Sequence, residues 1–91
     1  QDDGAKLNHA LALLQNQRTS EAQAVLATLN SGELTGLYFS VYQLALFELN
    51  YLKGDREKAL ESASKIEARF LKPPQVRWLE QTVKSLKASK G

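Results

Sequence analysis

The sequence predicts an all-α protein of five antiparallel helices, and three observations carry this prediction. Apolar residues recur at intervals of three and four along most of the chain, which is the period of a helix buried on one side. Only short polar, glycine or proline breaks separate these stretches, and short connections favour antiparallel neighbours. Nowhere do apolar and polar residues alternate as in a half-buried strand. With 91 residues, we expect one domain over 1–91 in which nearly every helix contributes to one core.

The first two helices are predicted in the N-terminal third of the chain. The first has an apolar stripe at helical spacing, formed by Leu7, Ala10, Leu11 and Leu14. This stripe ends in the polar run 15–18, after which Thr19 or Ser20 is a suitable N-cap for a second helix. The second apolar face consists of Ala22, Val25, Leu26 and Leu29. The run Asn-Ser-Gly at 30–32 predicts the end of that helix.

The third predicted helix, over 37–52, is apolar on nearly every side. Its polar residues are Ser40, Gln43, Glu48 and Asn50. Its 16 residues span about 24 Å, which is shorter than the roughly 30 Å hydrocarbon core of a bilayer. A helix of this kind has to be covered by neighbours on several sides. We therefore expect it to be the central helix of the fold, with Thr35 or Ser31 as its N-cap.

The last two helices follow a tight break at Gly54 and Asp55. Gly54 suits the left-handed conformation at a helix end, and Asp55 suits the N-cap of the next helix. The fourth helix is expected to bury Ala59, Ala63, Ile66 and Phe70 and to end at Pro73-Pro74. Pro74 fits the first turn of a fifth helix. The apolar side of that helix consists of Val76, Leu79, Val83 and Leu86.

The chain also contains an internal repeat with an offset of 37 residues. This offset places Leu7 on Leu44, Ala10 on Phe47, Ala22 on Ala59, Leu26 on Ala63 and Leu29 on Ile66. With the Gly54-Asp55 turn, the run Glu57-Lys58-Ala59-Leu60 and Pro73-Pro74, the chain resembles the tetratricopeptide repeat (TPR) family, whose period is about 34 residues. The first unit has Gln17 where this family typically has glycine. The resemblance implies an α-α superhelix of two TPR-like helix-turn-helix hairpins, about 4–30 and 37–70, and a capping helix, about 74–88.

One side of the central helix is the predicted binding surface. At about 100° per residue, five polar or aromatic side chains fall within roughly 100° of arc: Ser40, Gln43, Phe47, Asn50 and Tyr51. In a TPR-like array this strip would lie on the concave side and bind a peptide or a partner helix. Leu7, Leu11 and Leu14 would either stand at its border or, as their apolar stripe favours, pack in the core. The function expected is that of a non-catalytic adaptor, scaffold or assembly factor. Self-association through the same surface is a further possibility, and packing of the strip within the chain is the alternative.

A nucleic-acid-binding role is the alternative function. Residues 1–52 carry two basic and five acidic side chains, whereas residues 53–91 carry ten basic and five acidic ones. The basic candidates are Arg56, Lys65, Arg69, Lys72, Arg77, Lys84 and Lys87, with Trp78 or Phe70 for stacking. Against this role, Glu61 precedes Lys65 and Glu80 precedes Lys84 by four residues, a spacing typical of a solvated helix face. Membrane binding is not favoured, because the apolar side of the last helix suits the core.

Catalysis, cofactors and metals are not expected. The chain has no cysteine, one histidine at position 9, no glycine-rich phosphate loop and no helical His/Glu metal spacing. It has no methionine and begins Gln-Asp-Asp-Gly. This start is typical of a mature periplasmic or secreted protein after signal-peptide removal, or alternatively of a domain excised from a longer cytoplasmic protein.

Overall fold

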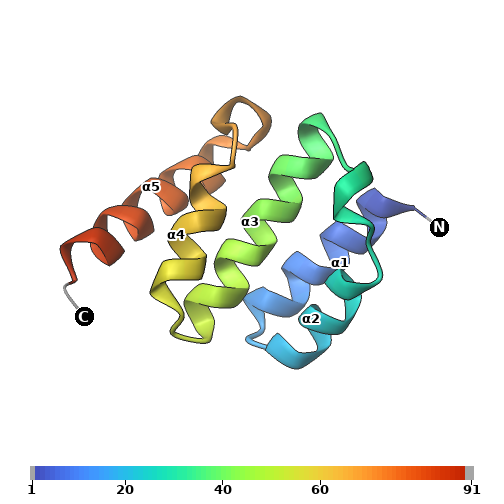
Figure 1. Cartoon of the computed structure of the whole chain (residues 1–91), viewed down its shortest axis with the longest axis horizontal. Coiled ribbons are helices and arrows are strands. Elements are labelled where there is room, and N and C mark those ends of the chain that lie inside the picture. The colour runs from blue at the N-terminus through green and yellow to red at the C-terminus, as the bar shows by residue number, and fades with distance from the viewer. Residues whose placement is uncertain (1, 90–91) are drawn as a thin grey trace.

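Five α-helices and two short 3₁₀ turns form the computed structural model of the chain, which describes residues 2–89 (Figure 1). The helices are α1 (Asp3–Gln15), α2 (Thr19–Ala27), α3 (Gly36–Leu52), α4 (Arg56–Ser64) and α5 (Pro73–Ala88). The 3₁₀ turns are η1 (Ser31–Glu33) and η2 (Ala68–Phe70). No strand occurs in the described residues, so the predicted all-α class is confirmed. The predicted domain of residues 1–91 includes three residues, 1 and 90–91, that lie outside this range.

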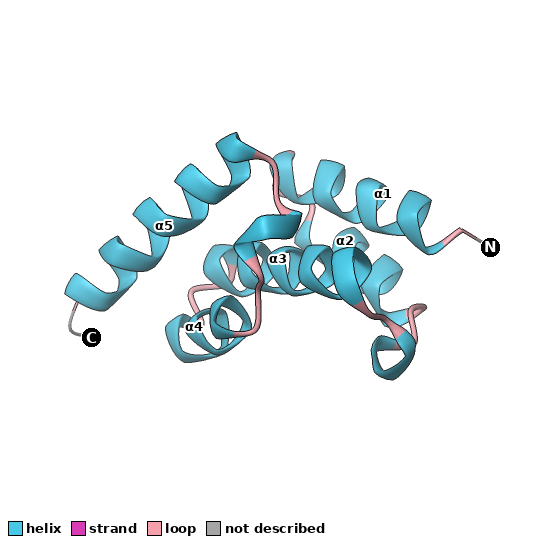
Figure 2. Cartoon of the chain, turned by 90° about the horizontal axis from the view of Figure 1, so that it is seen from above, coloured by secondary structure: helices cyan, strands magenta, loops and turns pink. Residues whose placement is uncertain are grey.

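Helix α3 lies at the centre of the structure, as its apolar surface predicts. It packs against α1, α2, α4 and η2. Figure 2 shows α1 and α5 on one side of α3 and α4 on the other. One core cluster joins α1 and α2 to α3 through Ala45 and Leu49. A second cluster joins α3 to the rest of the chain and consists of Leu44, Phe47, Ala59, Leu71 and Leu79. The two clusters lie against different sides of α3, which explains why this helix is apolar nearly all round.

The repeat seen in the sequence recurs in the bounds of the elements. Helix α4 begins and ends 37 residues after α2, η2 begins and ends 37 residues after η1, and α5 begins 37 residues after α3. Ala22 and Ala59, which the same offset aligns, are both completely buried. Gln17 and Gly54, also 37 apart, both have a positive φ, of 60° and 78°. Each small alanine allows close approach of the helices that pack on it, so the two units repeat in backbone as well as in sequence.

The fourth helix is shorter than predicted. Helix α4 ends at Ser64, before Ile66 and Phe70, which the apolar period had assigned to it. The Ser64 hydroxyl donates to the carbonyl of Glu61 at 2.6 Å, and the backbone N–H of Glu67 donates to Ser40 Oγ at 3.0 Å. These bonds hold the chain in a non-helical course that leads into η2 and buries Leu71. The two prolines begin α5 and do not end α4.

The helix caps follow the prediction in the second unit only. Asp55 is the N-cap of α4, and its carboxylate accepts the N–H of Lys58 at 3.1 Å. Gly54 has the left-handed φ expected of it. In the first unit, however, Arg18 and not Thr19 or Ser20 is the N-cap of α2, and its side chain makes no capping bond. Thr35 stands at the N-cap of α3 without a side-chain cap bond. The two repeat units therefore differ in how their second helix begins.

Candidate functional site

Three of the five predicted binding residues are buried. Ser40, Gln43 and Phe47 have exposed fractions of 1%, 6% and 0%. Their side of α3 faces α4 and η2, since Ser40 accepts the N–H of Glu67 and Phe47 shares a core cluster with Ala59. The predicted strip is therefore not a continuous exposed surface. The chain itself covers most of it, which is the alternative that the sequence left open.

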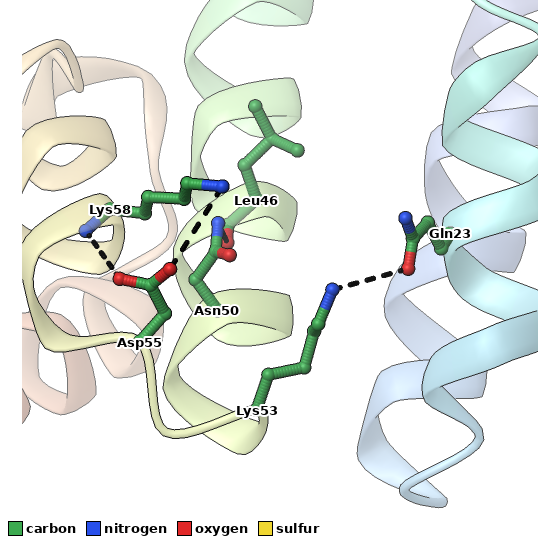
Figure 3. Close-up of polar contacts among 6 residues, drawn as sticks. All are labelled: Gln23, Leu46, Asn50, Lys53, Asp55 and Lys58. Carbon is green, nitrogen blue, oxygen red and sulfur yellow. Dashed lines mark hydrogen bonds and ion pairs between the residues drawn. The ribbon is translucent and has the colours of Figure 1, made fainter.

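The other two predicted residues lie at the C-terminal end of α3. Asn50 is half-buried, and its side-chain amide donates to the carbonyl of Leu46 in its own helix at 2.9 Å (Figure 3). In the same view Lys53 extends from the end of α3 to Gln23 of α2, with 3.4 Å between Lys53 Nζ and Gln23 Oε1. Tyr51 is 42% exposed. Of the five predicted residues, only Tyr51 presents a large accessible side chain, and its contact with a partner stays a prediction.

Tyr51 belongs to a cluster of three aromatic rings between α3 and α5. Its ring stacks on Phe47 with 6.4 Å between the centroids and meets Trp78 edge to face at 6.1 Å. Trp78 also meets Phe47 edge to face at 5.5 Å. Phe47 is buried, Trp78 is half-buried and Tyr51 is exposed, so the cluster runs from the core to the surface. Such packing fixes the orientation of the Trp78 ring.

The open side of α3 lies next to the predicted strip, about 90° around the helix. It consists of Leu37, Val41, Leu44, Glu48 and Tyr51, which recur at intervals of four and three residues. Four of these residues, all but Tyr51, line two hollows between α1 and α5. The sequence placed the open side wrongly because a helix that is apolar nearly all round does not indicate which side its neighbours leave uncovered.

The two hollows are neighbours that share two lining residues, and together we call them the central groove. The first, of about 430 Å³, is lined by Asp2, Gly4, Ala5, Leu7, Asn8, Leu11, Leu37, Tyr38, Val41, Phe70, Lys72 and Gln75. The second, of about 300 Å³, is lined by Leu11, Gln15, Leu44, Glu48, Pro74, Gln75 and Trp78. Leu11 and Gln75 belong to both. Leu7 and Leu11 line the first hollow, and Leu7 and Leu14 belong to the core cluster of α1, α2 and α3, which is the core packing that the sequence favoured for these leucines.

Exposed apolar side chains stand at both ends of α3. Leu37 and Tyr38, at the first hollow of the central groove, are 47% and 42% exposed, and Tyr51 stands at the other end of α3. Tyr38 extends toward α1, where a methyl group added to Gly4 would come within 2.9 Å of the Tyr38 hydroxyl. The lack of a side chain at Gly4 therefore lets Tyr38 reach across this end of the groove. Tyr51 was predicted as a binding residue from the sequence, whereas Leu37 and Tyr38 were not.

Glu48 is the one titratable group that lines the second hollow. Burial raises the pKa of its carboxyl above the ordinary value of 4.5. It has no ion pair and no hydrogen bond among residues 2–89. Glu48 is also the only charged residue between Leu37 and Leu52. Carboxylates are seldom buried without a partner, so the single charge in this apolar helix indicates the side that the neighbouring helices leave open. This was the signal in the sequence that could have located the open side.

Three of the seven basic candidates for nucleic-acid binding have partners within the chain. Arg56 Nε donates to the carbonyl of Leu86 at 2.7 Å, and Lys65 pairs with Glu61 at 3.8 Å. Arg69 pairs with Glu67 at 3.0 Å, and its guanidinium lies 4.7 Å from the centre of the Phe70 ring. These contacts explain part of the basic composition of the second half without a nucleic acid.

The rest of the surface has a further apolar hollow, and residues 2–89 show neither a metal site nor a membrane-spanning helix. A hollow of about 470 Å³ lies between α4 and α5 and is lined by Leu60, Ala63, Ser64, Leu79, Glu80, Val83, Lys84 and Lys87. Residues 2–89 contain no group of three or more His, Cys, Asp or Glu side chains placed to hold a metal ion. Within the same range, no helix has both the length and the apolar character needed to cross a membrane.

We compared the chain with protein-family profiles, with curated proteins and with solved structures, and found no match in any of the three comparisons.

Proposed function

We propose that this chain is a non-catalytic protein-interaction module, acting as an adaptor, scaffold or assembly factor, that binds a peptide segment of a partner in the central groove. The observation that carries this proposal is the position of the exposed large apolar side chains. In the described residues these are Leu37, Tyr38 and Tyr51, and all three belong to α3. Apolar and aromatic side chains along a groove with polar walls are typical of a peptide-binding surface.

The internal repeat supports a TPR-like arrangement for this groove. The offset of 37 residues makes α1, α3 and α5 the first helices of successive units, and these are the helices that line the central groove. We propose that the two hairpins form a short right-handed α-α superhelix with α5 as its capping helix. The second helices, α2 and α4, do not line the groove, as expected of the convex side of such an array.

The walls of the central groove offer groups that can contact both the side chains and the backbone of a bound peptide. Leu37, Val41 and Leu11 provide apolar contacts for side chains in the first hollow. Gln15 and Gln75 place amides on opposite walls, where they can bond to a peptide backbone. The Gln75 oxygen accepts the backbone N–H of Lys72 at 2.9 Å, which orients the amide and leaves its nitrogen available to donate. Fixing a side chain in this way lowers the entropy lost on binding.

The test uses Trp78, the only tryptophan of the chain, which lines the central groove. Peptides are selected from a random library against the purified protein and then titrated while tryptophan emission is followed. Tyr38→Ala and Leu37→Ser are expected to weaken binding by about tenfold each, as for residues at the centre of an interface. Leu60→Ser, which removes a leucine from the hollow between α4 and α5, is the matched control and should bind like the wild type.

Two results would contradict the proposal. One is failure to select any peptide whose binding depends on Leu37 or Tyr38, and the other is binding that leaves Trp78 emission unchanged. Oligonucleotide binding that weakens steeply with salt would favour the nucleic-acid alternative, whether or not a base stacks on Trp78 and changes this emission. Light scattering of the free protein would show whether a second copy occupies the groove.

A further inference from the structure

Glu48 occupies a position that does not favour a carboxylate. It lines the floor of the second hollow of the central groove with Leu11, Leu44 and Trp78 around it. Its surroundings raise its pKa, because partial burial disfavours the charged form. Neither α1 nor α5 places a basic side chain in this hollow, since their lining residues there are Leu11, Gln15, Pro74, Gln75 and Trp78. Among residues 2–89, no side chain therefore pairs with this partly buried carboxylate.

The internal repeat indicates that the fold does not need a charge at this position. The residue 37 positions before Glu48 is Leu11, which lies at the corresponding place on α1 and also lines the central groove. Leucine is thus accepted at this register of a groove-lining helix. A partly buried, unpaired glutamate, where its repeat equivalent is apolar, is expected when the carboxylate serves binding instead of packing.

We propose that the second hollow of the central groove is a specificity site that binds one lysine or arginine side chain of the partner peptide through the Glu48 carboxylate. This inference rests on the proposed function. The hollow measures about 300 Å³, which is enough for a long basic side chain. Its aliphatic stem would pack on Leu11 and Leu44, and its cationic group would bond to Glu48 beside the ring of Trp78.

Charge complementarity gives this site its selectivity. An ion pair that is partly removed from water is stronger than one on the open surface, because screening by solvent is weaker. A cation in the hollow would also remove the cost that the unpaired carboxylate now imposes. An acidic side chain would instead meet Glu48 as a like charge in a poorly solvated site, so the hollow rejects it. Arginine is favoured over lysine where its planar guanidinium can stack on Trp78.

The experiment selects random displayed peptides separately against the wild type, Glu48→Gln, Glu48→Lys and Glu80→Gln. Glu80 is an exposed carboxylate on the α4 side of α5, so Glu80→Gln changes the net charge as Glu48→Gln does but leaves the groove intact. The wild type and Glu80→Gln should both enrich a lysine or arginine at one fixed position of the selected peptides. Glu48→Gln should lose that preference, and Glu48→Lys should replace it with aspartate or glutamate.

The affinities of one selected peptide give the quantitative result. By Trp78 emission, Glu48→Gln should bind a wild-type-selected peptide about tenfold more weakly, and replacing the basic residue of the peptide by norleucine should cost the wild type a similar factor. In Glu48→Gln, the same norleucine replacement should change the affinity little. Peptides that need Leu37 and Tyr38 but show no basic preference, or bind Glu48→Gln equally well, would overturn this inference and leave the proposed function standing. Selection of no groove-dependent peptide would overturn both.

Discussion

The two repeat units share their backbone plan but differ in the side chains at equivalent positions. Their second helices and the 3₁₀ turns after them keep the same bounds at an offset of 37 residues, and the alanines Ala22 and Ala59 are completely buried in both. The first unit, however, has Ala10 where the second has Phe47, and Leu11 where the second has Glu48. Features common to both units therefore maintain the helix packing, whereas Glu48, which only the second unit has, gives the central groove a carboxylate.

The difference has a physical origin in the neighbours of each unit. Ala10 belongs to the cluster formed by α1, α2 and α3, whereas Phe47 fills the space between α3, α4 and α5. Helix α5 lies farther from α3 than α4 does. The large ring of Phe47 spans the wider space and brings α3 into contact with Trp78 of α5. The comparison teaches that one backbone repeat can carry different side chains at equivalent positions, here a small core alanine in one unit and a large aromatic ring in the other.

Phe47→Ala should give the largest loss of stability. Phe47 is completely buried and contacts both Tyr51 and Trp78. Truncation of a buried phenylalanine leaves a cavity and costs about 3 to 5 kcal/mol of unfolding free energy. Denaturant unfolding followed by circular dichroism measures this loss. Tyr51→Ala, which removes an exposed ring of the same cluster, should cost much less unfolding free energy. Equal losses for the two variants would contradict the tight packing around Phe47.

Enlarging the two equivalent alanines should destabilise both units by similar amounts. Ala22→Leu and Ala59→Leu each force a bulky side chain into a fully buried position, at a cost of about 1 to 3 kcal/mol. Ala24→Leu, on the exposed side of α2, is the control and should be nearly neutral. Thermal unfolding of the three variants checks this expectation. A large cost at one alanine and none at the other would show that the two helix pairs do not pack alike.

The N-caps of α2 and α4 should respond in opposite directions. Asp55→Ala removes the bond to the N–H of Lys58 and should cost about 1 kcal/mol. Arg18→Asp supplies the missing side-chain cap to α2 and should stabilise the chain by a similar or smaller amount. The exposed ion pair between Arg18 and Glu21, at 3.5 Å, is lost in this change but contributes little. Chemical denaturation of both variants provides the measurement. A lower unfolding free energy for Arg18→Asp would contradict the prediction that a side-chain cap is missing from α2.

The left-handed residues that precede these caps allow a still finer comparison. Gln17 has a φ of 60° in the first unit, where the second has Gly54 at 78°. Gln17→Gly should relieve the strain of a side chain in this conformation and stabilise the fold by about 0.5 kcal/mol, because part of the gain is lost to the greater freedom of the unfolded chain. Gly54→Ala should be destabilising. Calorimetric midpoints that move in the same direction for both variants would be inconsistent with this account.

Glu48→Gln should have the smallest effect on stability, and that effect should depend on pH. Since burial raises the pKa of Glu48 in the folded chain, the contribution of this group to stability is full below its ordinary value of 4.5 and is lost as the pH rises through the higher folded value. At neutral pH the glutamine variant should therefore be more stable, by no more than about 0.5 kcal/mol. Unfolding curves at neutral and acidic pH should show this advantage disappear on acidification, whereas Glu80→Gln should show no such advantage at neutral pH.

Much of this arrangement was predictable from local sequence. The apolar periods gave the five helices, the all-round apolar stretch identified α3 as the central helix, and Gly54 with Asp55 marked the break before α4. The end of α4 was not predictable from these periods, because Ile66 and Phe70 continue the helical spacing of Ala59 and Ala63 after the backbone has left the helix. Its end depends on the bond between Glu67 and Ser40, two residues 27 positions apart.

The sequence alone thus determined the helices, their order and the repeat, because these follow from the spacing of apolar residues and from turn chemistry between near neighbours in the chain. Only the tertiary structure decided which side of α3 stays open. That side depends on where α4 and α5 pack, which covers Ser40, Gln43 and Phe47 and leaves Leu37, Glu48 and Tyr51 beside the groove. A helix with apolar residues on all sides can be covered from several directions, and the contacts that choose between them join residues far apart in the chain.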